Sequence, residues 1–216
     1  IPPITCIGKS AFSGCTALTF IDIPNSVRVI EANAFHGCTA LSSITIPTSV
    51  VLMLDKAFGN CTTLTSIVIP TSISSIPAGA FSGCTALTSI DIPTSVVEIG
   101  ARAFFKCCTL SSLDLPTIDS LEASIFYKCT TLTSIVIPTS VAWIRESAFY
   151  GCTALTSIDI PTSIKSIGED AFRACTALAS INVPNSVTSI GIDAFYGCTA
   201  LTLIDIPSSV TTIGKK

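Results

Sequence analysis

The sequence has little of what catalytic and metal sites are usually built from. Its 216 residues include one histidine, one tryptophan and one methionine, and charged residues make up only 12%. No motif supplies His36 with an acidic or nucleophilic partner, and no Gly-rich phosphate loop, nucleophile elbow or metal signature occurs. These absences predict a protein that is not an enzyme, with no catalytic residue, no bound metal and no cofactor.

Long apolar runs and basic clusters are also absent. Although 49% of the residues are hydrophobic, no run approaches the ~18 residues that a membrane-spanning helix needs. The net charge is −3, without a basic block or an alternation of basic and aromatic residues, which argues against nucleic acid as a partner. The apolar residues instead recur at regular positions, which indicates a repeated core.

What the sequence does contain is one unit copied end to end. A phenylalanine recurs every 23 residues, except for one step of 22, and a cysteine follows it three residues later. A leucine, two Ile/Leu/Val positions and a proline come next in the same order, which predicts a stacked repeat array. The repeated phenylalanines are Phe12, Phe35, Phe58, Phe81, Phe104, Phe126, Phe149, Phe172 and Phe195.

Each unit is predicted to contain two extended pieces and one turn. The Leu-x-x-Ile-x-Ile segment alternates apolar and polar residues, as a strand with one buried face does, and the proline directly after it ends the strand. The Val-x-x-Ile-Gly segment is a second, shorter extended piece. The Ala-Phe-x-Gly-Cys segment is interpreted as a single helical or 3₁₀ turn with its alanine and phenylalanine facing inward.

This combined pattern resembles the leucine-rich repeat of BspA-like surface proteins from bacteria and protists. The resemblance covers essentially residues 1–216. It implies an α/β repeat solenoid, with a parallel β-sheet on the concave face and short strands and 3₁₀ or helical turns on the convex side. It also implies an extracellular or cell-surface location and a role in adhesion or protein recognition, with the specific activity residing in the variable positions.

The whole chain, 1–216, is predicted to be a single solenoid of nine full units with a partial unit at each end. Residues 1–4 match residues 115–118 of an internal unit, and the chain closes within another unit at 213–214. Neither end shows the polar cap that solenoids need for solubility. We therefore expect a segment of a longer protein, or uncapped ends that contact other chains.

Eleven cysteines would suggest disulfides in a secreted protein, but their spacing argues otherwise. Nine of them occupy one equivalent position per repeat, where a free cysteine behaves as a small buried hydrophobic residue. The side chains of such a ladder point the same way, so disulfides are disfavoured even though neighbouring coils lie close enough. We predict a reduced cysteine ladder, with Cys6 and Cys108 off the ladder and Cys108 as the candidate for a reactive or palmitoylated thiol.

Five aspartates form a sparse acidic stripe between the two isoleucine positions of the first strand, predicted to lie on the concave face. This stripe could bind a cationic partner or Ca²⁺. It could also simply keep an exposed sheet soluble, which is the interpretation we favour. The stripe consists of Asp22, Asp91, Asp114, Asp159 and Asp205.

The residue after the repeat phenylalanine provides the candidate partner-binding surface. In the C-terminal half this position holds four aromatic residues and an arginine in line, predicted to lie on the side away from the sheet, and the only tryptophan is in the same half. Such residues are enriched at binding hot spots, although the rings could instead pack over small residues of the convex side. The candidates are Phe105, Tyr127, Trp143, Tyr150, Arg173 and Tyr196.

One repeat is irregular, and irregular repeats are expected to mark contact surfaces. Between Phe104 and Phe126 the serine that elsewhere follows Pro-Thr is missing after residues 116–117. In the same region Lys106 and Lys128 replace the turn glycine found in other repeats.

The function predicted from the sequence is a non-enzymatic scaffold for protein recognition or adhesion, whose partner is an unidentified protein or a glycan. The main alternative is a structural subunit bound within a larger assembly. Threonine columns such as Thr48, Thr71 and Thr94 add a minor alternative, ice binding, because regular hydroxyl rows could order water. Threonine and serine also suit strand edges and tight turns, however.

Overall fold

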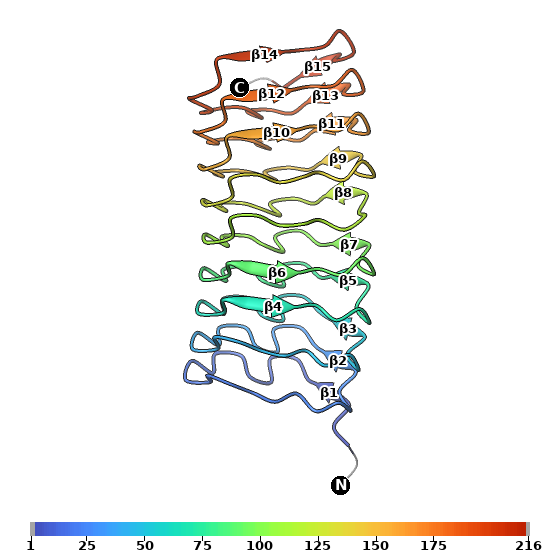
Figure 1. Ribbon diagram of the computed structural model, residues 1–216, viewed down its shortest axis with the longest axis vertical. Coiled ribbons are helices and arrows are strands. Elements are labelled where there is room, and N and C mark those ends of the chain that lie inside the picture. The colour runs from blue at the N-terminus through green and yellow to red at the C-terminus, as the bar shows by residue number, and fades with distance from the viewer. Residues whose placement is uncertain (1–2, 215–216) are drawn as a thin grey trace.

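The computed structural model describes residues 3–214, which form an elongated column of stacked coils (Figure 1). The coils follow one another in sequence order, from the N-terminal end at the bottom of the view to the C-terminal end at the top. Residues 1–2 and 215–216, which the predicted repeat domain includes, lie outside the described residues.

Two ladders of short parallel strands run along the column and appear as two columns of labels in Figure 1. Each strand residue pairs with the equivalent residue of the neighbouring coil, as Ser157 does with Ser180. The first ladder contains β4 (Ser66–Val68), β6 (Ser89–Asp91), β10 (Ser157–Asp159), β12 (Ser180–Asn182) and β14 (Leu203–Asp205). These pairings confirm the predicted parallel-strand solenoid.

The second ladder lies on the x-Ile segment that precedes the glycine position of each repeat. Its pairings group as β1–β2–β3, β5–β7 and β8–β9–β11–β13–β15. The strands are β1 (Cys6–Ile7), β2 (Val29–Ile30), β3 (Leu52–Met53), β5 (Ser75–Ile76), β7 (Glu98–Ile99), β8 (Ser120–Leu121), β9 (Trp143–Ile144), β11 (Ser166–Ile167), β13 (Ser189–Ile190) and β15 (Thr212–Ile213).

The core is a set of vertical stacks, one for each inward position of the repeat. The alanine, phenylalanine, cysteine, leucine, valine and isoleucine positions are buried in the central coils. The repeat phenylalanines stack from Phe12 to Phe195 with centroids 5.3 to 6.0 Å apart and nearly parallel planes. Offset stacking at this distance is favourable beyond the burial of area, so identical residues in register stabilise one another.

The predicted helical character of the turn segment is wrong, since residues 3–214 contain no α- or 3₁₀-helix. Every turn segment has two residues with positive φ, four positions apart, such as Asn33 at 57° and Gly37 at 74°. A left-handed residue interrupts the right-handed helical backbone, and only three residues separate the two in each coil. The solenoid is therefore a parallel β-solenoid and not an α/β fold.

The hydrogen bonds of the turn segment explain this geometry. Phe12 N–H donates to the Ala34 carbonyl at 2.8 Å and Gly14 N–H to the His36 carbonyl at 2.7 Å, both in the next coil. The N–H group between them closes a tight turn within the coil, since Ser13 N–H donates to the Ser10 carbonyl at 3.0 Å. Because alternate donors point along the column, a continuous helical ladder cannot form.

Eight of the nine ladder cysteines are buried as predicted, Cys15 of the first unit is exposed, and all nine thiols are free. Each of the eight buried thiols donates a hydrogen bond to the phenylalanine carbonyl of the preceding coil, as Cys107 does to Phe81 at 3.2 Å and Cys198 to Phe172 at 3.0 Å. Cysteine therefore supplies both a small apolar group and a weak donor at this position.

Replacing Phe104 with alanine tests the aromatic stack. The ring lies fully buried between Phe81 and Phe126, at 6.0 and 5.6 Å. We expect the variant to lose about 3–5 kcal/mol in the free energy of unfolding, measured by urea denaturation. The control Phe20→Ala removes a ring that is 66% exposed and should change stability by less than about 0.5 kcal/mol. Equal losses would contradict a buried stack.

The cysteine ladder also predicts a loss of stability at alkaline pH. Burial raises the pKa of Cys84 and Cys175 to about 12. The unfolded chain loses these protons first, near pH 8.5, so the stabilising contribution is complete below that pH and disappears as the pH approaches 12. Each such thiol contributes a slope of about −1.4 kcal/mol per pH unit across this window.

Urea midpoints measured from neutral to alkaline pH would show this decline. The double variant Cys84→Ala, Cys175→Ala should have a shallower decline than the wild type, because two ladder thiols no longer ionise on unfolding. Cys108→Ala, off the ladder, is the matched control. A midpoint independent of pH, or identical slopes in all three proteins, would rule out the effect.

Candidate functional site

Five of the six predicted partner-binding residues lie together on the turn segments of five consecutive coils, and we call this set the aromatic column. The rings of Phe105 and Tyr127 are 4.7 Å apart and those of Tyr127 and Tyr150 are 4.6 Å apart. The planes of each pair lie within 15° of parallel. The aromatic column consists of Phe105, Tyr127, Tyr150, Arg173 and Tyr196.

The coil spacing itself produces this stack. Backbone hydrogen bonds hold neighbouring coils about 4.8 Å apart. Equivalent side chains that adopt the same rotamer therefore lie at aromatic stacking distance. Each pair contributes roughly 0.5–1.5 kcal/mol beyond the area that it buries. The rings are half-buried against one another, and Tyr196, nearest the C-terminus, is 48% exposed. The result is a flat, preformed aromatic surface with accessible edges.

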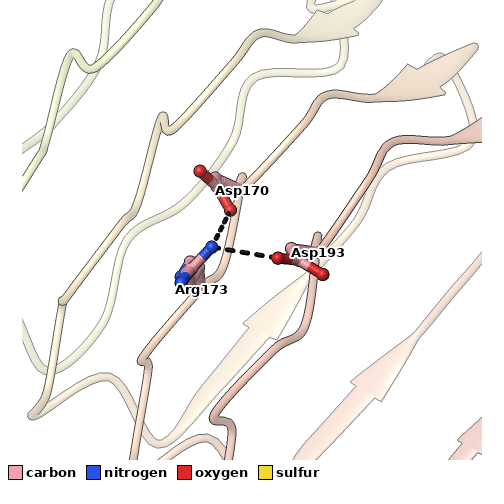
Figure 2. A network of polar contacts seen from close by, with 3 residues as sticks. All are labelled: Asp170, Arg173 and Asp193. Atoms are coloured by element: carbon pink, nitrogen blue, oxygen red, sulfur yellow. Dashed lines mark hydrogen bonds and ion pairs between the residues drawn. The ribbon is translucent and has the colours of Figure 1, made fainter. Parts of the chain in front are cut away.

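Arg173 continues the aromatic column between two tyrosines. Its guanidinium carbon lies 5.9 Å from the Tyr150 ring centroid and 4.6 Å from that of Tyr196. Figure 2 shows one terminal nitrogen shared by Asp170 at 3.1 Å and Asp193 at 3.0 Å. The hydrogen bond to Asp170 is the main cause that raises the pKa of Arg173. The side chain is therefore held in place, and its charge is compensated.

Three further cations flank the column, and the sequence analysis did not assign them to it. Lys106 Nζ lies 5.3 Å from the Phe105 ring centroid and Lys128 Nζ 5.7 Å from that of Tyr127. Arg102 also approaches Phe105, at 5.9 Å. Both lysines stand at left-handed turn positions, with φ of 59° and 55°. The signal in the sequence was the lysine directly after each aromatic residue.

Trp143, the sixth candidate, is not part of the aromatic column. It belongs to β9 of the second ladder, where it pairs in register with Ser120 and Ser166. Its ring faces Arg145, whose guanidinium carbon lies 5.2 Å from the ring centroid. Trp143 and the aromatic column therefore lie in the same half of the sequence but on different parts of the surface.

The acidic stripe lies at exposed positions on the face of the first ladder. Asp159 and Asp205 are separated by Asn182 in the register of β10, β12 and β14. In residues 3–214 there is no group of three or more His, Cys, Asp or Glu residues that could hold a metal. Asp22, Asp91 and Asp114 are likewise exposed.

Residues 3–214 also include no helix long and apolar enough to cross a membrane.

Comparison with known proteins identifies the repeat. A family model described as BspA type Leucine rich repeat region, in six copies, matches residues 5–131 and 105–216. None of the curated proteins matches the chain.

Several solved structures are similar to the chain. A leucine-rich repeat protein of T. pallidum (TpLRR) is 29% identical, with a TM-score of 0.71 over 80% of this chain and 82% of that chain. A leucine-rich repeat protein from Bacteroides ovatus is 28% identical, with a TM-score of 0.55 over 98% and 78%. The pneumococcal vaccine antigen PcpA shares the fold at 22% identity, with a TM-score of 0.61 over 98% and 64%.

Proposed function

This chain belongs to the BspA-type leucine-rich repeat family, whose solenoids are generally non-enzymatic scaffolds for protein interaction, and we propose that it binds a protein partner through the aromatic column. The observation that supports this is the continuous stack of three rings, one arginine and a further tyrosine on five consecutive coils. Such a surface is ordered before binding, so little conformational entropy is lost on association. An adhesive role at the cell surface, as the family resemblance implies, would use the same surface.

The charges beside the rings indicate the chemistry of the partner. Arg173 is neutralised by two aspartates, whereas Arg102, Lys106 and Lys128 form no ion pair with any residue in the range 3–214. These three cations surround the Phe105 and Tyr127 rings. A partner with acidic side chains next to aromatic or apolar ones would complement these cations and rings, although the net charge of the whole chain is itself negative.

The size of the column suits an extended segment. Five coils at about 4.8 Å spacing span about 19 Å, which an extended peptide of about six residues covers. We therefore propose a linear acidic-aromatic segment of a partner protein as the bound element. Alternate side chains of such a segment would reach the rings, and its carboxylates would reach the lysines.

The test is a selection of random displayed peptides on the wild-type protein. We expect enriched peptides that combine acidic and aromatic residues, and weaker binding as salt increases. The double variant Tyr127→Ala, Tyr150→Ala should bind the selected peptides at least about thirtyfold more weakly. This corresponds to a loss of about 2 kcal/mol in binding free energy, the contribution of one hot-spot residue.

Phe20→Ala is the matched control, because it removes an exposed ring away from the column. Selected peptides that bind the double variant as tightly as the wild type would exclude the aromatic column as the binding surface. Peptides without acidic residues, bound equally at low and high salt, would exclude the proposed charge complementarity.

A further inference from the structure

The second ladder is interrupted at the irregular repeat. Among residues 3–214 it has two breaks. One lies between β3 and β5, where Pro77 stands at a position that donates an N–H in other coils. The other lies between β7 and β8, in the repeat that lacks one serine. Only the second break coincides with a change in repeat length.

Backbone groups at this second break lack their usual partners. In flanking coils Val97 N–H donates to the Ser74 carbonyl at 2.9 Å, and Ala142 N–H donates to the Asp119 carbonyl at 2.8 Å. No equivalent bond joins Asp119 N–H to the Val97 carbonyl within the described chain. Among the described residues the same bond is absent at the first break, between Ser74 N–H and the Val51 carbonyl, so each break leaves one donor and one acceptor without this bond.

A cavity of about 330 Å³ lies over the break and extends across three coils, β7, β8 and β9. This volume is at the lower end of the range for small-ligand pockets. We call it the notch. The polar and aromatic residues of its lining are Glu98, Asp119, Ser120, Glu122, Trp143 and Arg145.

One side of the notch is a fixed aromatic and cationic pair. Arg145 Nε–H donates to Ser120 Oγ at 3.2 Å, and Nε lies 3.9 Å from Glu122 Oε1. Ser120 is only 6% exposed, so this hydroxyl forms a buried anchor. Trp143 remains 38% exposed. The arginine is therefore held through Nε, and within residues 3–214 its terminal nitrogens have no hydrogen-bond or ion-pair partner.

The other side supplies acceptors. The carboxylates of Glu98 and Asp119 have no hydrogen-bond or ion-pair partner within residues 3–214. The unpaired Val97 carbonyl adds another acceptor, and the Asp119 N–H adds a donor. The notch therefore combines donors and acceptors with an accessible indole surface.

We propose that the notch binds a neutral sugar ring. A hydroxyl group both donates and accepts hydrogen bonds, so a polyhydroxylated ring can satisfy both sides of the notch, whereas an ammonium group only donates and a carboxylate only accepts. The apolar face of the ring would stack on Trp143, an aromatic body suited to such a contact. This site is separate from the aromatic column and does not depend on the proposed protein partner.

Trp143 is the only tryptophan, so its emission reports on the notch directly. The wild-type protein would be titrated with methyl α-D-mannopyranoside, N-acetyl-D-glucosamine, lactose and maltotriose, with calorimetry as the second measurement. We expect a saturable change in emission with at least one of them. Asp119→Ala should weaken that binding about tenfold or more, because hydroxyl donors lose a charged acceptor.

A second variant restores the repeat length by inserting a serine between Thr117 and Ile118. We expect it to close the break and abolish the sugar response. The double variant Tyr127→Ala, Tyr150→Ala should keep the sugar response unchanged. A failure of the sugar proposal can therefore be told apart from a failure of the proposed protein-binding surface.

The absence of any saturable signal with the four sugars would overturn the proposal, as would unchanged binding in Asp119→Ala. Saturable binding of tri-lysine without sugar binding would also overturn it.

Discussion

The hydrogen bonds between successive coils are the constraint on which the rest of the structure depends. They fix the coil spacing at about 4.8 Å and place each residue beside its equivalent, as Ser157 beside Ser180. A substitution in one coil therefore also changes the contacts of the equivalent residues in the coils before and after it. The stacked phenylalanine core and the thiol-to-carbonyl bonds of the cysteines both follow from this alignment.

The same alignment converts scattered surface residues into extended surfaces. Phe105, Tyr127 and Tyr150 are more than twenty residues apart in sequence, yet the centroids of successive rings lie only 4.7 and 4.6 Å apart. A scaffold of this kind can acquire a binding surface by single replacements at one repeat position, while the buried positions stay unchanged.

The sequence predicts the repeat, the buried positions and the parallel strands, because all three follow from the spacing of Phe, Cys and Ile. It did not predict the backbone of the turn. Lys56, Arg102 and Ser147 adopt positive φ there, and no residue preference of those types signals it. The contact of Lys106 with Phe105 depends on the direction of a side chain at a left-handed turn position. The separation of Trp143 from the column follows from its different repeat position, in β9, which the register of the sequence already contains.

The break between β7 and β8 has a consequence for folding cooperativity. In a linear array each coil contacts only its neighbours, so the weakest junction determines where partial opening occurs. At this junction the ladder bonds are missing while the Phe81–Phe104–Phe126 stack continues beneath. Across the same junction the turn segments stay bonded, because the N–H groups of Arg102, Phe104 and Lys106 donate to carbonyls of the next coil. Local opening at the deleted residue is therefore expected to separate the strands of the second ladder first, while the turn side of the column stays closed.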